Sequence, residues 1–175
     1  METTITESEE KRYAELQLLA LDAARNGDTP LLAAMLQAGL PVNLQDLKGN
    51  TLLMLAAYHG QAETVACLLA AGAEPDRRNH RHQTPLGGVA FKGYVEIAQQ
   101  LLDAGADLNA DQGSGTTSLM LASLFGRVDM IKLLHHHGAN PDARNRWGLS
   151  AGLLGGFFQA LSKIRHPFQP SSPSA

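Results

Sequence analysis

Apolar residues along the chain fall into short helical segments that are separated by glycine. The segment LLMLAAYH at 52–59 is almost uniformly apolar, and AETVACLLAA at 62–71 follows it after Gly60. In the second segment Val65 and Leu68 recur at a helical spacing, which indicates a helix with one buried stripe. Together the segments predict a helix, a tight turn at the glycine and a second helix.

The same pair of segments recurs twice along the chain. PLGGVAFK and YVEIAQQLLDA form one copy at 85–92 and 94–104, and SLMLASLF and RVDMIKLLHHH form another at 118–125 and 127–137. A hydroxyl residue precedes each first segment, at Thr51, Thr84 and Thr117. A hydroxyl in this place can accept a backbone N–H bond at the start of a helix. We therefore expect helical pairs of one common design.

Glycines repeat with a period of 33 residues, which organises most of the chain. The first series is Gly39, Gly72, Gly105 and Gly138. The second series is Gly27, Gly60, Gly93 and Gly126. A third series is interrupted once by histidine and reads Gly49, His82, Gly115 and Gly148. Interleaved series with one period indicate a repeated unit of a turn, a helix, a tight turn, a second helix and a loop.

These units resemble the ankyrin-repeat family, whose unit pattern is D-x-x-G-x-T-P-L-H-L-A-A-x-x-G-x-x-E-x-V-x-x-L-L-x-x-G-A-D-x-N. The match is close in GNTLLMLAAYHGQAETVACLLAAGAEPD, in TPLGGVAFKGYVEIAQQLLDAGADLN and in TSLMLASLFGRVDMIKLLHHHGANPD. The resemblance covers most of the chain. It implies an all-α solenoid of stacked helix-turn-helix units, in which β-turn fingers project from one side.

The resemblance also divides the chain into units. We expect an N-terminal capping repeat at 13–45, full repeats at 46–78, 79–111 and 112–144, and a degenerate C-terminal capping repeat at 145–162. Terminal repeats are expected to be irregular because one of their faces meets water instead of a neighbour. Residues 1–12 and the Pro- and Ser-rich residues 163–175 lack a helical period, so we expect flexible segments there.

Two features depart from the family pattern. The family's histidine after the first leucine is replaced by Met54, Gly87 and Met120, so the hydrogen bonds that this histidine makes between repeats are not expected here. Gly87 and Gly88 also lie inside a predicted helix, where each costs about 1 kcal/mol relative to alanine. We therefore expect the repeat at 79–111 to be the least stable.

Proteins of this family resemble a cupped hand, in which the turn tips are the fingers and the exposed side of the first helices is the palm. Two adjacent positions near the end of each first helix are expected to face the palm. The first position holds Tyr58, Phe91, Leu124 and Phe157, and the second holds His59, Lys92, Phe125 and Phe158. The first repeat has Arg25 and Asn26 there, so the line becomes more apolar along the chain.

This line predicts a binding site. Contiguous exposed apolar surface usually marks an interaction site, and aromatic side chains are common anchors of interfaces. We therefore interpret Tyr58, Phe91 and Phe125 as partner contacts. An alternative stays open, in which Phe157 and Phe158 fold back to close the last repeat. In that case the tail of the chain covers the end of the line.

The fingers are expected to supply a polar rim. Its residues are Lys48 and Asn50, then His80, Arg81 and Gln83, then Thr116, and last Arg146 and Trp147. The second finger, from Arg77 to His82, is strongly basic, and it either docks an acidic loop of the partner or is a hydrated turn. Trp147 is the single tryptophan, and it either packs against the preceding turn or anchors the partner.

Composition narrows the class of partner. The 175 residues include 14 Lys and Arg against 17 Asp and Glu, and a net charge of -3 offers no attraction for a phosphate backbone. The amino terminus is acidic where an export signal would be basic, and the nearly uncharged stretch from Leu149 to Leu161 is too short to span a bilayer. We expect a protein partner, no nucleic acid, no membrane, and a monomer in the cytoplasm.

Catalytic and metal-binding patterns are weak. Cys67 is the single cysteine, which excludes an intramolecular disulfide, and we expect it as a buried core thiol on the inner face of its helix. His135, His136 and His137 point about 100° apart on a helix and cannot converge on one ion. QGSGTTS lacks the Gly-Lys-Ser/Thr of a phosphate-binding loop. We therefore expect no enzymatic activity, no cofactor and no metal.

Three functions remain. The first is a binding module that holds a folded protein partner across its concave face. The second is a small subunit that inhibits or stabilises a partner enzyme by masking its active site. The third is a structural protein that associates with itself through the apolar segment from Leu153 to Leu161.

Overall fold

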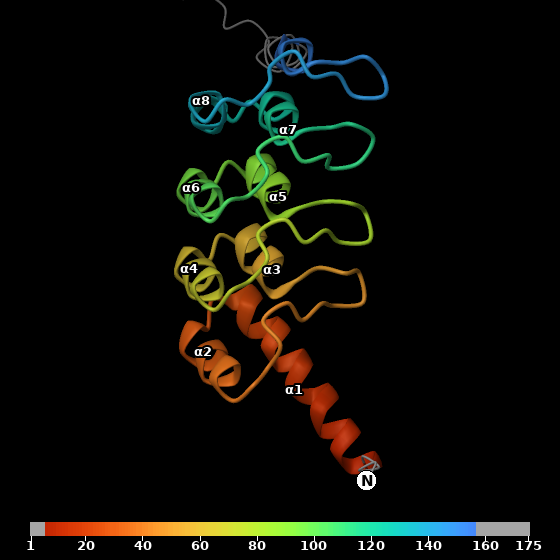
Figure 1. The fold of residues 1–175 in the computed structure, drawn as a ribbon, viewed down its shortest axis with the longest axis vertical. Coiled ribbons are helices and arrows are strands. Elements are labelled where there is room, and N and C mark those ends of the chain that lie inside the picture. The colour runs from red at the N-terminus through yellow and green to blue at the C-terminus, as the bar shows by residue number, and fades with distance from the viewer. Residues whose placement is uncertain (1–5, 157–175) are drawn as a thin grey trace, which may run out of the picture.

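The computed structural model describes residues 6–156 and consists of stacked helical pairs (Figure 1). In this part of the chain the helices are α1 (Glu7–Asn26), α2 (Thr29–Gln37), α3 (Leu52–His59), α4 (Ala62–Ala70), α5 (Pro85–Lys92), α6 (Val95–Asp103), α7 (Ser118–Leu124) and α8 (Val128–His136). Residues 151–156 are also helical. The described residues form no sheet, only an isolated bridge between Gln45 and Thr51. The prediction of an all-α solenoid is confirmed.

The helices form two parallel columns. The first helices of the pairs, α1, α3, α5 and α7, stack on one another, and α2, α4, α6 and α8 form the second column (Figure 1). The loops between successive pairs all extend to the same side of the stack (Figure 1). The fingers that the sequence predicts therefore lie in a row beside the first column.

Threonine caps the first helix of each full repeat, as the sequence predicts. Its side-chain oxygen accepts the backbone N–H three residues further on, from Met54 to Thr51 at 3.1 Å, from Gly87 to Thr84 at 3.4 Å and from Met120 to Thr117 at 3.3 Å. Two of these helices end at a glycine in the left-handed conformation, at Gly60 with φ 82° and at Gly93 with φ 85°. The repeated threonine caps start α3, α5 and α7 at the same position of each 33-residue repeat, which lets the pairs stack in register.

The core lies between the two columns. Leucine, methionine and valine side chains fill it, and the largest fully buried ones are Leu32, Leu52, Leu53, Val65, Leu68, Leu86, Val89, Leu101, Leu119, Met120, Met130 and Leu134. The prediction of a buried Cys67 is wrong, because this side chain is only half-buried. It precedes the buried Leu68 by one position on α4, so the rotation of about 100° per residue turns it toward the edge of the core.

Helix α1 starts earlier than the sequence led us to expect. Thr6 and Glu9 form a reciprocal capping box, in which Glu9 N–H donates to Thr6 Oγ1 at 3.4 Å and Thr6 N–H donates to Glu9 Oε2 at 2.8 Å. Residues 7–12, predicted to be flexible, are therefore helical, because the box satisfies backbone groups that the helix start leaves free. The outer half of α1 projects beyond α2 (Figure 1). None of the helices within residues 6–156 has the length and apolar content that crossing a bilayer requires.

The loops after the second helices bond from repeat to repeat. Glu74 N–H donates to Asn43 Oδ1 at 3.0 Å, and the same bond recurs as Asp107 N–H to Asp76 Oδ2 at 2.8 Å. Burial raises the pKa of Asp76 despite this hydrogen bond, and the nearby Asp107 carboxylate adds to the rise. These bonds fix the spacing between repeats, and thereby the spacing between the fingers.

Candidate binding surface

Each finger closes on an Asx-type turn. In the first finger, at 46–50, Asp46 Oδ1 accepts the backbone N–H groups of Lys48 at 2.8 Å and Asn50 at 2.9 Å. Side-chain oxygens take the same role in the later fingers, at Asn79, Asp111 and Asn145. Short side chains of this kind close a turn by bonding the backbone two and four residues on. The fingers are thus held in shape by their own first residues.

The first two fingers are also joined to each other. His80 N–H donates to Lys48 O at 3.0 Å, and Asn79 Nδ2 donates to Asn50 Oδ1 at 2.9 Å. The His80 ring lies against Gly49, where an added Cβ would come within 2.7 Å of the ring. His80 and Asn50, predicted as rim contacts, therefore take part in holding the fingers together. Lys48 and Arg81 remain exposed on the joined pair.

Aromatic rings form a continuous stripe across the palm. The rings of Tyr58 and Phe91 are stacked, with centroids 6.4 Å apart and planes 2° apart. Phe125 meets Phe91 edge-on, with centroids 4.5 Å apart. Tyr58 is 41% exposed and Phe125 39% exposed, while Phe91 is half-buried between them. The aromatic stripe, defined here as Tyr58, Phe91 and Phe125, is thus open to solvent among the described residues.

The neighbours of the stripe have different orientations. Lys92 places its Nζ 4.5 Å above the centroid of the Tyr58 ring, a cation–π contact. His59 Nδ1 is hydrogen-bonded to Leu55 O at 2.9 Å, which turns the imidazole back along its own helix. Leu124 is half-buried. Phe157 and Phe158, the last members predicted for the stripe, lie outside the described residues.

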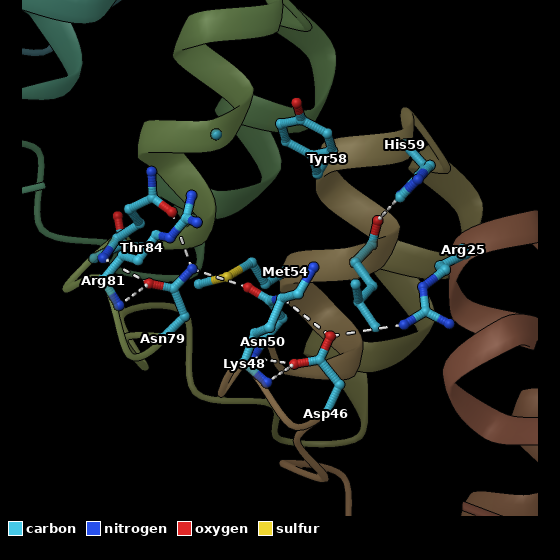
Figure 2. Close-up of a pocket in the computed structure, with 13 residues that line it drawn as sticks. Arg25, Asp46, Lys48, Asn50, Met54, Tyr58, His59, Asn79, Arg81 and Thr84 are labelled. Carbon is cyan, nitrogen blue, oxygen red and sulfur yellow. Dashed lines mark hydrogen bonds and ion pairs between the residues drawn. The ribbon is translucent and has the colours of Figure 1, made fainter. Parts of the chain in front are cut away.

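Two hollows open beside the aromatic stripe. The first, of about 400 Å³, lies between the first two fingers and α3, and its lining includes Met54, Leu55 and Tyr58 (Figure 2). The second, of about 320 Å³, lies over α5 and includes Phe91 and Leu121. Gln83, Tyr58 and Gly88 line both hollows. The two hollows therefore adjoin each other on the palm, and Gln83 and Thr116 of the predicted rim border them.

Gly88 explains why the palm is hollowed at this point. In the 33-residue register Gly88 corresponds to Leu55 in the repeat before and to Leu121 in the repeat after. Leu55 lines the first hollow and Leu121 lines the second. The missing side chain leaves space between these leucines. As a glycine inside a predicted helix, Gly88 indicates only lower stability, whereas the register Leu55, Gly88 and Leu121 indicates the hollow.

Gly87, the adjacent glycine, makes room for a side chain of the next repeat. Gln112 is buried, and its Oε1 accepts the backbone N–H of Thr84 at 2.8 Å. Its Nε2 donates to Thr84 Oγ1 at 2.9 Å and to Ala110 O at 3.2 Å. A Cβ at Gly87 would collide with the Gln112 amide group. This amide supplies a bond between repeats at the place where the family pattern has histidine.

Positive charge gathers around the first hollow. Lys48 and Arg81 reach it from neighbouring fingers, and Lys92 lies at its edge over Tyr58. None of the three forms an ion pair within the described residues. Arg25 also lines the hollow, but its guanidinium contacts Asp22 at 2.6 Å and Asp46 at 3.6 Å. Figure 2 shows Lys48, Arg81 and Arg25 arranged around the opening.

Asp46 is the acidic residue that lines this hollow, and its carboxylate is hydrogen-bonded to Lys48 and Asn50 and paired with Arg25. Burial alone would raise the pKa of Asp46. The hydrogen bonds from the Asn50 side chain, from the backbone N–H groups of Asn50 and Lys48, and the charge of Arg25 together hold that pKa below its ordinary value. Asp46 is therefore ionised at neutral pH and committed to the finger.

Among the first helices, only α1 carries acidic residues, at Glu7, Glu9, Glu10, Glu15 and Asp22. No Asp or Glu occurs in α3, α5 or α7. The second helices carry Glu63, Glu96 and Asp129 in their first turns and Asp103 at the end of α6. The palm over α3, α5 and α7 is therefore more cationic than the net charge of -3 indicates.

The fourth finger, at 145–149, exposes the tryptophan. Trp147 is 65% exposed, and the Arg146 guanidinium lies 5.6 Å from the centroid of its ring. Its backbone N–H donates to Asn145 Oδ1, which fixes the turn but not the ring. Trp147 thus stands beside Arg146 at the far end of the row of fingers from the first hollow.

The histidine run lies elsewhere, at the end of α8. His136 and His137 meet edge-on with centroids 5.8 Å apart, and His137 Nε2 is within 3.2 Å of Gln99 Oε1. Within residues 6–156 no group of three or more His, Cys, Asp or Glu side chains is arranged to hold a metal ion. This run therefore adds nothing to the palm.

Comparison with known proteins agrees with the repeat pattern. A family model described as ankyrin repeats, three copies, matches residues 20–112 and, in a second overlapping match, residues 71–145. The two matches together cover well over half of the chain. No curated protein matches the sequence.

Proposed function

This chain belongs to the ankyrin-repeat family, whose members are generally protein–protein interaction modules, and we propose that it binds a partner protein across its palm. The observation that carries the proposal is the exposed aromatic stripe beside two adjoining hollows. Aromatic side chains supply large, rigid contact area, and truncation of one at the centre of an interface costs about 2 kcal/mol or more.

The geometry supports a folded or extended protein segment as the occupant. The hollows accept individual side chains, while the fingers offer exposed polar groups beside them. A central apolar patch with a polar rim is the arrangement typical of protein interfaces. We expect Tyr58, Phe91 and Phe125 to form the centre, and Lys48, Arg81, Lys92 and Gln83 to form the rim.

The test compares two double variants in a capture experiment. The immobilised full chain should retain a partner from an extract of the source cells. With Tyr58→Ala/Phe91→Ala the amount of partner retained should fall at least tenfold. The matched control is Tyr13→Ala/Leu18→Ala, which truncates exposed residues on α1 and should capture normally. Thermal unfolding followed by circular dichroism should shift by only a few degrees, because the truncated stripe is partly exposed. Undiminished capture by the stripe variant would reject the palm as the binding site.

We propose further that the chain acts as a cytoplasmic monomer and that it serves as an adaptor or scaffold rather than as an enzyme. A single cysteine and the lack of a catalytic constellation in the sequence support this role. If the captured partner is an enzyme, its activity with and without the chain distinguishes an inhibitory or stabilising subunit from a simple adaptor. Self-association through 153–161 involves a segment that lies mostly outside the described residues, and light scattering tests it directly.

A further inference from the structure

The two hollows on the palm form one receptor for a side chain. They adjoin over Gly88, and their shared border is the face of Tyr58. Leu55 lines the first hollow and Leu121 the second, so each hollow offers apolar surface beside Tyr58. An apolar side chain placed over Gly88 would contact surface that neighbouring repeats cover with their own leucines, and its burial is favourable in proportion to the area removed from water.

The rim of the same receptor is cationic. Lys48, Arg81 and Lys92 come from the first finger, the second finger and the end of α5, and none is neutralised by a described carboxylate. The backbone bond between His80 and Lys48 O fixes the distance between the two fingers. Cations beside a half-enclosed hollow attract carboxylates more strongly than cations on an open surface.

We propose that the occupant of this receptor is an acidic segment of the partner protein, which places one apolar side chain over Gly88 and carboxylates against Lys48, Arg81 and Lys92. This inference rests on the proposed function and specifies its partner. The segment is extended rather than a bulky domain surface, because the hollow lies between two fingers and the palm helix α3 (Figure 2). Charge complementarity governs the register of such a segment, and the apolar anchor supplies most of its affinity.

A nucleic acid strand fits the same surface less well. Proteins that bind nucleic acid through its backbone commonly make roughly 6–10 phosphate contacts. Here three cations without an acidic partner surround the hollow, and Asp46 and Asp111 lie in the neighbouring fingers. The net charge of -3 also opposes a polyanion at long range. A short peptide with two or three carboxylates matches the available cations.

The probe is a peptide selected on the protein itself. A phage library of random dodecapeptides is panned on the full chain, and the enriched peptides are synthesised with a fluorescent label for anisotropy titration. We expect enriched peptides to combine an apolar residue with at least two acidic residues and to bind more weakly as salt rises. A labelled single-stranded DNA dodecamer is titrated in parallel.

Variants of the cationic rim and of Gly88 locate the binding. Lys48→Glu/Arg81→Glu should weaken peptide binding at least tenfold, whereas Arg12→Glu/Lys132→Glu makes the same change in net charge on α1 and α8 and should leave it unchanged. Gly88→Leu restores the side chain that the flanking repeats carry and should also weaken binding at least tenfold. A Cβ at Gly88 would lie 3.3 Å from Tyr58 Cδ2, so Gly88→Ala is the milder second variant if the leucine disturbs folding.

Each outcome decides between the two proposals. Loss of binding in the charge variant, in the Gly88 variants and in Tyr58→Ala/Phe91→Ala supports the acidic-segment receptor. If only Tyr58→Ala/Phe91→Ala loses peptide binding, the palm remains the binding face, but the inference that the peptide is acidic and binds over Gly88 is overturned. Peptides that are neutral or basic, tighter binding of the DNA, or a library without enrichment would each overturn the inference. Binding that none of the variants affects would overturn the proposed function as well.

Discussion

Replacement of Gly87 by alanine tests how the repeats are joined. Gly87 lies in α5, and alanine in a helix interior is normally more stable than glycine by about 1 kcal/mol. On helix propensity alone Gly87→Ala should therefore stabilise the protein. The packing argues for the opposite sign, because the new methyl group would occupy the place of the Gln112 amide.

The expected size follows from the bonds that Gln112 would lose. Its Oε1 accepts the buried Thr84 N–H at 2.8 Å, and its Nε2 donates to Thr84 Oγ1 and Ala110 O. A buried donor left without a partner costs about 1–3 kcal/mol. Subtracting the gain in helix propensity leaves a net destabilisation of up to about 2 kcal/mol for Gly87→Ala.

A double-mutant cycle separates these two contributions. Gln112→Ala removes the amide and opens the space above Gly87, so Gly87→Ala in that background should stabilise by up to about 1 kcal/mol. The sign of the same substitution therefore reverses between the two backgrounds. The coupling free energy should be about 1–3 kcal/mol, within the range for residues in contact.

Urea unfolding measures all four proteins. Circular dichroism follows the helix content of wild type, Gly87→Ala, Gln112→Ala and the double variant, and equal slopes against urea show that the cycle compares the same transition. Stabilisation by Gly87→Ala in both backgrounds would show that Gln112 is not anchored at Thr84. Equal destabilisation in both would place the cost elsewhere than in the Gln112 contact. Either result would refute the reasoning.

Two further predictions concern the fingers. Since the pKa of Asp46 is lowered from its ordinary 3.8, its contribution to stability is present above that pH and is lost as pH falls through the lower folded value. Asp46→Asn should therefore reduce the loss of stability on acidification, measured by urea unfolding at neutral and acidic pH; an unchanged acid response would contradict this. His82 has φ 63°, where other fingers have glycine, so His82→Gly should stabilise by about 0.5–1 kcal/mol, and a lower urea midpoint would contradict it.

The repeat architecture could be predicted because its determinants are local and periodic. Threonine caps at Thr51, Thr84 and Thr117 and glycine ends at Gly60 and Gly93 act within one helix each, and all of them follow one spacing. The aromatic stripe followed from the same register. The structure brings Phe125, from the second predicted palm position, into contact with Phe91 from the first.

Other features could not be predicted from the sequence, because they depend on contacts between repeats or have only a weak local signal. Thr6 and Glu9 have the spacing of a capping box, but the polar residues around them lack a helical period and so predict a flexible segment in place of the start of α1. The apolar helical stripe beside Cys67 predicts a core position for it, although one residue of rotation moves it outward. No local pattern could show that Gln112 fills the space at Gly87, since the pair is joined only by stacking of the repeats.

The two adjacent glycines of α5 lie on neighbouring faces of one helix and have different roles. Gly87 admits a buried amide from the next repeat, and the bonds of that amide to Thr84 offset the helix propensity that the glycine loses. Gly88 gains no such hydrogen bond, and its position, bordered by the Tyr58 ring, is where the proposed receptor lies on the palm. A stack of repeats tolerates this second loss because each unit is also supported by the caps and leucines of its neighbours. Removal of a side chain at one register can therefore create a binding site without changing the fold that presents it.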